Sequence, residues 1–325
     1  MRDLAPTLRR WISEGRPFAV ATVVRTWGSS PRPIGASMAV DTESNVVGSV
    51  SGGCVEGAVV AAALGAMEAS TPAYLQFESV SDDVAWQIGL PCGGAIEVWV
   101  EPNPDVGAAL EAIETGEPIV RRIARSDGNL DAAAAIALSE RRSLLADGGF
   151  VQFIGRAPQL LIIGASHIAI PLVAMARTMG FRTTVVDSRT VLLRPDRFDV
   201  APDRTIAEPP ERALRSIALD DDVAAVCLSH DPKFELPALR TLLRSDVGYI
   251  GLLGSRSTQA ARRDALRAEG FSDAELRRIR GPVGLDLGAR SPEEIALSIL
   301  AEIVAIRNGV GGSEGSSATP ESVSQ

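Results

Sequence analysis

The stretch Leu160-Leu161-Ile162-Ile163-Gly164-Ala165-Ser166-His167 decides the fold of the second half of this chain. Its four apolar residues form the continuous run that is typical of a strand covered on both faces of a parallel sheet. The glycine behind them leads into a segment, 167–179, that favours a helix. The same alternation predicts a strand at 183–186, a strand at 223–228, a helix at 235–244 and a strand at 247–253. This order of elements predicts an α/β fold with a parallel sheet and crossover helices.

The turn between the first strand and its helix departs from the dinucleotide-binding pattern, which has three spaced glycines and an acid about 20 residues later. Gly164 supplies the first glycine and Asp187 the acid, whereas Ser166 and Ala169 stand at the other two glycine positions. A side chain at 166 adds bulk where the backbone should approach a pyrophosphate. The sequence therefore supports a Rossmann-type domain more strongly than it supports nicotinamide binding.

Several polar residues map to the carboxyl ends of the predicted strands, where open parallel sheets bind their ligands. The chain has two histidines, His167 and His230, and both follow such strands. His167 suits a contact with a ligand phosphate and equally suits a solvent-facing ring, and the spacing of the two histidines fits no standard metal motif. Another strand-to-helix turn offers amides and a guanidinium to an anion, with close backbone packing as the alternative, at Gly254, Ser255 and Arg256.

Two turns nearer the N-terminus are rich in glycine and hydroxyl groups. The first carries amides, hydroxyls and a guanidinium suited to wrapping a phosphate. The second enters a helix expected at 54–68, and a helix N-terminus favours a bound anion and a thiolate. Glu56, in that first helical turn, also suits the helix dipole and has a purely structural explanation. We therefore predict phosphate-binding roles for Gly28, Ser29, Ser30, Arg32, Gly52 and Gly53.

The chain has three cysteines, and two of them lie beside paired glycines. Thiolates bind soft metals and react with sulfur species, so Cys54 and Cys92 are candidate catalytic and metal-contacting residues. The pair is not a CxxC motif, so any cooperation between the two must come from the fold. Cys227 lies in a predicted buried strand and is interpreted as a small hydrophobic residue. Together with the anion-binding turns, these thiols predict a phosphorylated, sulfur-rich cofactor.

A length of 325 residues suggests about two domains. Near residue 157 the predicted elements begin to alternate between strand and helix. This change predicts a smaller mixed α/β N-terminal domain, 1–156, and a Rossmann-type domain, 157–308. The glycine- and serine-rich end, 309–325, has no large apolar anchor and is predicted to be disordered. Within the first domain we expect helices at 3–15 and 54–68 and strands at 18–26, 36–41, 46–51, 73–79, 95–101 and 118–124.

Composition excludes several classes of protein. The net charge of −9 argues against a general nucleic-acid binder, which would carry basic patches. Three cysteines do not make a secreted disulfide framework. The N-terminus lacks the apolar core of a signal peptide, and no apolar run is long enough to span a bilayer. We therefore expect a cytoplasmic protein that binds neither nucleic acid nor membrane.

Capping boxes at Ser272 and Ser291 predict two helices in the last part of the second domain.

These turns together make the sequence resemble the XdhC/CoxI family, accessory proteins of molybdenum hydroxylases such as xanthine dehydrogenase. The matching segments are Gly28–Arg32 with Gly35–Ala36, Gly48–Glu56, Pro91–Gly94, Gly164–Ala169, Val186–Arg189, Ser229–Asp231, Tyr249–Arg256 and Gly281–Ala289. The resemblance covers nearly the whole chain outside 103–150 and the tail. Family members usually have glycine where this chain has Ser166, and a histidine commonly follows the His-Asp pair where this chain has Pro232 and Lys233.

The resemblance implies a chaperone of the molybdopterin-type molybdenum cofactor that promotes the cofactor's terminal sulfuration and inserts it into a xanthine dehydrogenase-type enzyme. The implied partners are an apo molybdenum hydroxylase and a cysteine desulfurase, and a homodimer is the default assembly. The Rossmann half would hold a nucleotide portion of a cytidine-linked cofactor, a free nucleotide such as NAD(P), or the partner. The hydroxylase itself is not expected, because its iron–sulfur clusters need four cysteine ligands each and the chain has three cysteines.

Two other functions stay open at the level of the sequence. An NAD(P)-dependent oxidoreductase would use the Rossmann domain, with Asp187 choosing NAD over NADP. A non-catalytic scaffold would only dock a partner, and substitution of its cysteines would leave hydroxylase maturation intact.

Overall fold

The computed structural model describes residues 1–28, 30, 32–77, 94–124, 129–229 and 231–310. The chain divides into two compact units, Met1–Arg156 and Ala157–Gln325, and each is described by itself. The predicted tail, 309–325, lies outside the described residues from 311 onward. None of the helices in the described part of the chain combines the length and the apolar character that a bilayer crossing needs.

The second unit is built on a six-stranded sheet in which all neighbouring strands are parallel. Its strands are β9 (Gln159–Ile163), β10 (Arg182–Val186), β11 (Arg204–Ile206), β12 (Val223–Cys227), β13 (Tyr249–Leu252) and β14 (Ile279–Arg280). They lie in the order β11-β10-β9-β12-β13-β14, which is the strand order of a doubly wound Rossmann sheet. The predicted Rossmann-type fold is confirmed, and the order reverses direction between β9 and β12.

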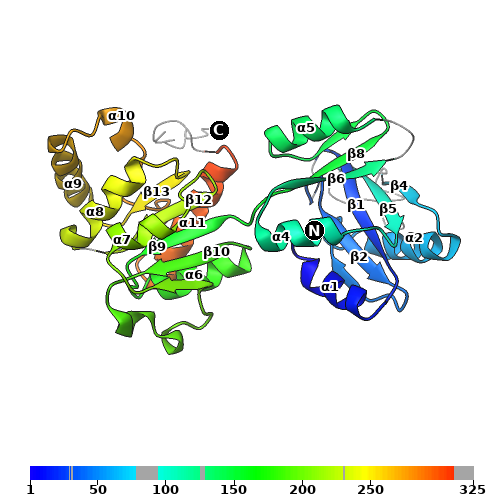
Figure 1. Ribbon diagram of the computed structural model, residues 1–325, viewed down its shortest axis with the longest axis horizontal. Helices are drawn as coiled ribbons and strands as arrows, with labels where there is room; N and C mark the ends of the chain where they lie inside the picture. Colours follow the sequence, from blue (N-terminus) through cyan, green and yellow to red (C-terminus); the bar gives the residue numbers. More distant parts are fainter. Residues whose placement is uncertain (29, 31, 78–93, 125–128, 230, 311–325) are drawn as a thin grey trace, which may run out of the picture. The chain divides into compact units, whose positions relative to one another are not determined.

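Helices cover both faces of this sheet (Figure 1). One face packs against α6 (Ala169–Thr178) and α11 (Pro292–Arg307), and the other packs against α7 (Pro210–Ala213), α8 (Pro232–Leu243) and α9 (Arg256–Ala268). This double cover explains why the strands read as continuous apolar runs rather than as alternating ones. Both predicted capping boxes are present, at the starts of α10 (Asp273–Leu276) and α11.

Gly164 is the first glycine of the dinucleotide-binding pattern, and the conformation of its backbone requires a glycine. Its φ of +102° lies in the left-handed region, and a Cβ at this position would lie 3.0 Å from the backbone nitrogen of Ser229. Gly180 has a φ of +80° with no described atom within 4 Å of a Cβ. We predict that Gly164→Ala lowers the free energy of unfolding by about 1–3 kcal/mol more than Gly180→Ala, because overpacking adds to backbone strain. Urea unfolding of both variants checks this, and equal losses would contradict it.

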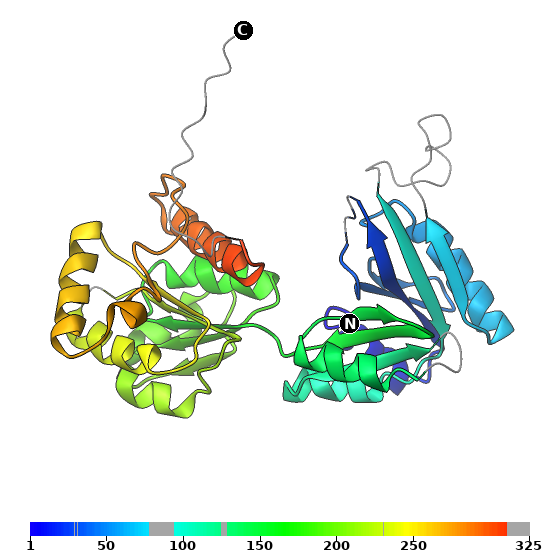
Figure 2. The same ribbon diagram turned by 90° about the horizontal axis from the view of Figure 1, so that it is seen from above.

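The first unit contains an antiparallel five-stranded sheet in the order β3-β2-β1-β5-β4. Its strands are β1 (Phe18–Trp27), β2 (Ser37–Asp41), β3 (Val46–Gly48), β4 (Ala73–Phe77) and β5 (Ala95–Pro102). The helix α2 (Glu56–Ala69) lies along one face, as Figure 2 shows in light blue. The helices α1 (Ala5–Ser13) and α4 (Gly107–Thr115) pack on the other face.

Alternation along β1 explains how this sheet is covered on both sides. Ala19, Ala21 and Val23 pack in the cluster that includes α2, whereas Val20 packs with α1 and α4. The buried Val24 instead contacts a small second sheet. That sheet has the order β6-β8-β7, with strands β6 (Ile119–Ala124), β7 (Leu144–Ala146) and β8 (Gly149–Ile154), and it is covered by α5 (Asp131–Ser139). Of these four elements the sequence predicted only β6.

The strand register brings several chain segments to one end of the five-stranded sheet. Trp27, at the end of β1, pairs with Ala95 at the start of β5, and Phe77 at the end of β4 pairs with Ile96. Gly48, at the end of β3, pairs with Met38 near the start of β2. The turn after β1 and the turn that carries Cys54 therefore leave the sheet at the same end.

Candidate functional site

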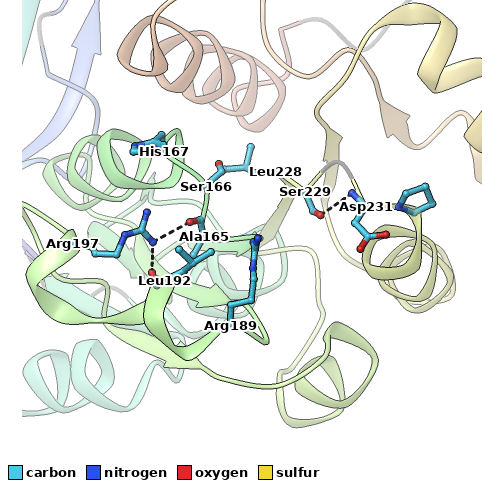
Figure 3. A pocket seen from close by; sticks show the side chains of 10 residues that line it. Ala165, Ser166, His167, Arg189, Leu192, Arg197, Leu228, Ser229 and Asp231 are labelled. Carbon is cyan, nitrogen blue, oxygen red and sulfur yellow. Dashed lines mark hydrogen bonds between the residues drawn. The ribbon is translucent and has the colours of Figure 1, made fainter.

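A cavity of about 680 Å³ lies at the carboxyl ends of β9 and β12, where the strand order reverses. Three segments line it, and Figure 3 shows their side chains. The lining residues are Ala165, Ser166, His167, Arg189, Leu192, Arg197, Leu228, Ser229, Asp231 and Pro232. This is the position at which open α/β sheets bind ligands, and the volume suits a ligand of nucleotide size. We call this cavity the crevice.

Ser166 lines the crevice in the turn between β9 and α6. Its Oγ is buried and has no hydrogen-bond partner among the described residues. A buried hydroxyl without a partner costs free energy unless a ligand or water satisfies it. His167, the next residue, is exposed. The other histidine that the sequence places near a ligand, His230, lies outside the described residues.

Asp187 is fully buried and already holds four hydrogen bonds. It accepts from the amide of Ala165 at 2.8 Å, the amide of Arg189 at 2.9 Å, and the Nε and Nη2 of Arg189 at 2.9 and 2.8 Å. Burial raises the pKa of the Asp187 carboxyl, but these hydrogen bonds outweigh it and the pKa lies below its ordinary value. In this structure the carboxylate that the sequence assigns to cofactor selection is held by Ala165 and Arg189.

Two arginines follow β10 and form another wall of the crevice. Arg189 uses its Nε and Nη2 on Asp187, and its Nη1 has no hydrogen-bond partner among the described residues. Arg197 donates from Nη1 to the carbonyl oxygens of Leu192, at 2.6 Å, and Ala165, at 3.2 Å. These contacts, which Figure 3 draws, hold the segment 190–197 against the turn after β9. Each guanidinium keeps donors that can reach an anion.

The turn between β13 and α9, which the sequence predicts to bind an anion, has a structural role at Gly254 and Ser255. Gly254 has a φ of +130°, and a Cβ there would lie 2.8 Å from Nη1 of Arg262, so close packing explains this glycine. The Oγ of Ser255 caps α9 by accepting from the amide of Thr258 at 3.3 Å. Arg256 is exposed at the first position of α9. The described lining of the crevice includes none of Gly254, Ser255 and Arg256.

In the first unit, the glycine-rich turn before α2 closes around a carboxylate of the protein itself. Glu56 accepts hydrogen bonds from the amides of four successive residues, Val50, Ser51, Gly52 and Gly53, at 2.8 to 3.2 Å. It also accepts from the hydroxyls of Ser49, at 2.6 Å, and Ser51, at 2.5 Å. In this structure the anion that the turn surrounds is the Glu56 carboxylate, which belongs to the protein itself. The amides of Gly52 and Gly53, which the sequence predicts to bind a phosphate, donate here to Glu56.

The pKa of Glu56 reflects this network. Burial raises it, but the hydrogen bonds from Ser49, Ser51 and the turn amides outweigh burial and lower the pKa to about 2. The carboxylate is therefore charged at neutral pH and holds the turn in one shape. Cys54 follows this turn, is exposed, and donates its amide to the Oγ of Ser51 at 3.0 Å. The thiol is thus presented to solvent from an ordered backbone.

The turn that follows β1 is also predicted to bind a phosphate, and some of its hydrogen-bond donors bond to carbonyl groups of the same turn. The amide of Ser30 donates to the carbonyl of Gly28 at 3.0 Å, and its hydroxyl donates to the carbonyl of Arg32 at 2.9 Å. Ser30, which the sequence predicts to bind a phosphate, therefore uses these two donors within the turn. Arg32 lies 3.7 Å from the carboxylate of Asp3, and its Nε is buried without a partner among the described residues. Two further predicted residues, Ser29 and Cys92, lie outside the described residues.

Cys227 is fully buried in β12 and behaves as a small hydrophobic residue. Burial raises the pKa of its thiol to about 12 from an ordinary value of 9.0. We predict that iodoacetamide at pH 9 modifies Cys54 in the native protein and modifies Cys227 only after denaturation, because the thiolate is the reactive form. Mass mapping of the modified peptides checks this. Modification of both cysteines at equal rates in the native protein would contradict it.

Comparisons with known proteins agree with both units. The XdhC and CoxI family matches residues 11–78, and the XdhC Rossmann domain matches residues 160–303. A Bacillus subtilis protein, named as a probable subunit of xanthine dehydrogenase, is 30% identical over 90% of this chain and 93% of its own length. The chain belongs to the XdhC and CoxI family.

Other relatives of this XdhC-type chain extend the comparison. The Escherichia coli protein named "Molybdenum cofactor insertion chaperone PaoD" is 29% identical, over 91% of this chain and 85% of PaoD. The E. coli protein YqeB is 27% identical over 91% of this chain, which spans only 44% of YqeB. A crystal structure titled as a xanthine dehydrogenase from Bacillus halodurans has a TM-score of 0.79 and 24% identity, covering 97% of this chain and 98% of that one. It supports the fold.

Sequence reasoning missed three residues that shape these sites. It gave Glu56 a structural role as one option but did not assign it to the turn, although the residue stands three positions after Gly53. Arg189 belongs to the segment Val186–Arg189 that carries the family resemblance, and its position two residues after Asp187 permits the local pair seen here. Arg197 reaches the crevice only through the fold of 190–197, and no motif marks it.

Proposed function

We propose that this XdhC/CoxI-family chain binds the molybdenum cofactor, promotes its sulfuration and inserts it into an apo-hydroxylase of the xanthine dehydrogenase type. The observation that carries this proposal is the match to the relative named as a molybdenum cofactor insertion chaperone, which spans 91% of this chain and therefore both units. The cofactor is the cargo in this proposal. The proposed partners are the apo-hydroxylase and a cysteine desulfurase, with the chain acting as a homodimer.

The exposed thiol of Cys54 gives this proposal its chemistry in the first unit. A thiolate is a ligand for soft metals and the reactive form of cysteine toward sulfur species. Because the turn around Glu56 fixes the backbone before Cys54, the sulfur projects from an ordered site rather than from a mobile loop. We propose that Cys54 contacts the molybdenum or holds sulfur in transit, and that the unpartnered Nε of Arg32 contributes to binding the cofactor's phosphate.

The experiment that tests this proposal is maturation of an apo-hydroxylase in a strain lacking this protein. The wild-type chain should restore hydroxylase activity, and Cys54→Ala should reduce the restored activity at least about tenfold if the thiol is a metal or sulfur ligand. Cys227→Ala is the matched control, because that cysteine is buried and should leave maturation unchanged. Full maturation by Cys54→Ala would support a non-catalytic scaffold instead. A chain that never restores activity would overturn the proposal.

A further inference from the structure

We propose that a small cavity at the amino end of β13, beside β14, binds one small oxyanion of the class of sulfate, phosphate and molybdate. Its volume is about 130 Å³, and we call it the arginine cavity. The crevice lies at the carboxyl ends of the same parallel sheet, so the two cavities are at opposite ends. Binding here does not depend on the proposed chaperone function. The lining residues are Val247, Gly248, Tyr249, Ile250, Arg277, Arg278, Arg280 and Ile306.

Positive charge gathers around the arginine cavity without a matching acid. Three arginines line it, and its described lining includes no aspartate or glutamate. Arg280 has interactions of its own, whereas Arg277 and Arg278 form no ion pair with a carboxylate of the described residues. Two guanidinium charges at one small space repel each other, and the apolar walls of Ile250 and Ile306 strengthen that repulsion. A bound anion would turn the repulsion into attraction.

The fold fixes the position of Arg278 in the wall of the cavity. Its Nη1 donates to the carbonyl of Leu243 at 2.8 Å, and its Nη2 donates to the carbonyls of Ser245 and Val247 at 2.8 and 2.9 Å. These acceptors are neutral, so they orient the guanidinium without cancelling its charge. A guanidinium held in one orientation loses less entropy when it binds an oxyanion. Arg278 is therefore preorganised for an anion.

Arg277 is available to close on an ion in the cavity, and the nearby acids are not. Arg277 is exposed and has no hydrogen-bond or ion-pair partner among the described residues. Glu275 accepts from the amide and the hydroxyl of Ser272, at 2.8 and 2.6 Å. Glu302 accepts from the hydroxyl of Tyr249 at 2.5 Å. Because both carboxylates have donors of their own, the counter-ion that the cavity lacks has to come from solution.

The volume of the arginine cavity limits what it can hold. Cavities that take drug-sized ligands and cofactors have volumes of roughly 300–1,000 Å³. A volume of about 130 Å³ is too small for a nucleotide and leaves room for a single tetrahedral ion. Guanidinium groups bind the oxygen atoms of such ions through charge-assisted hydrogen bonds. Size and charge together therefore favour a small oxyanion over an organic ligand.

Calorimetric titration of the full-length chain with sodium sulfate, sodium phosphate and sodium molybdate tests this site, with sodium chloride at equal ionic strength as the blank. We expect at least one of the three oxyanions to bind with a Kd of about 1 mM or tighter. Similar affinities would identify a general oxyanion site, whereas one ion that binds at least about tenfold tighter than the others would be identified as the ligand. Both results support the site. Weaker binding by all three ions would overturn it.

Matched variants assign the binding to the arginine cavity. Arg277→Gln should weaken it about tenfold or more, because a charge-assisted hydrogen bond is lost, and Arg277→Glu should weaken it further by adding a like charge. Arg277 is exposed, so both variants should fold. Arg215→Gln is the control, since Arg215 is an exposed arginine of the same unit outside the described lining of the cavity. Equal affinity in Arg277→Gln and Arg215→Gln would place the ion elsewhere, the crevice included, and overturn the assignment. The pterin content of the chain is measured separately, so that result would leave the chaperone proposal standing.

Discussion

Glu235→Ala is expected to lower the free energy of unfolding of the Rossmann unit by about 3–5 kcal/mol, because it leaves the buried guanidinium of Arg262 without its counter-charge. The side chains of Glu235 and Arg262 are 0% and 6% exposed, and Nη2 of Arg262 lies 2.7 Å from Oε1 of Glu235. The pair joins α8 to α9, and Nη1 of Arg262 also donates to the carbonyl of Leu253 at 2.8 Å. Chemical denaturation followed by circular dichroism measures the loss.

A matched control exists between the same two helices. Glu269 follows α9 and pairs with Arg240 on α8, but these side chains are 34% and 40% exposed. Glu269→Ala should therefore cost only about 0–1 kcal/mol, since water screens an exposed pair. The double variant Glu235→Leu with Arg262→Met should recover most of the loss, because it removes both buried charges. If Glu235→Ala and Glu269→Ala cost the same, the buried pair does not have the role assigned to it.

Glu56→Gln is expected to disorder the turn that presents Cys54. The substitution removes the charge and turns one acceptor into a donor that faces other donors, which should cost about 1.5–3 kcal/mol locally. Glu68→Gln is the control, because Glu68 lies on the same helix and is exposed. Amide hydrogen exchange should show faster exchange at the turn amides of Ser51, Gly52 and Gly53 in Glu56→Gln only. Unchanged protection there would contradict the network.

The carboxylate of Glu56 also makes the stability of the folded protein depend on pH in a direction that can be predicted. The pKa of Glu56 in the folded protein is about 2, below its ordinary value of 4.5. A lowered pKa means that this group stabilises the folded state fully above pH about 4.5, and that the contribution is lost as the pH falls toward 2. The difference in stability between the wild type and Glu56→Gln should therefore be largest at pH 6 and shrink by pH 3. A difference that does not change between those two pH values would contradict this.

Much of the fold was predictable because it depends on local patterns. The continuous apolar run of β9 and the serine–glutamate pairs at the starts of α10 and α11 each carry their signal within a few residues. Apart from β6, the segment 103–150 was not predictable in the same way. Its helix α5 consists largely of alanine, so a buried and an exposed face hardly differ in the sequence. The strand β14 has two residues, which is too short for any period to appear.

The candidate sites were predictable in their chemistry and less so in their partners. The glycines before α2 predict a set of amides around an anion, but which anion lies there depends on the fold of the turn, in which Gly52 and Gly53 have φ values of +83° and +125°. Asp187 stands where the fingerprint places an acid, and in the structure it pairs with Arg189, which the fingerprint does not predict. Side-chain pairing of this kind is a competition between neighbours in space, which spacing along the chain does not resolve.

The central claim is that this chain carries a molybdenum cofactor, and the most direct measurement is the pterin and molybdenum content of the purified protein. Oxidation of the full-length chain should release the fluorescent pterin product together with stoichiometric molybdenum. Cys54→Ala should lose most of both, whereas Cys227→Ala, at a cysteine sealed in β12, should retain them. Wild-type protein that holds neither pterin nor molybdenum after exposure to the cofactor would contradict the account.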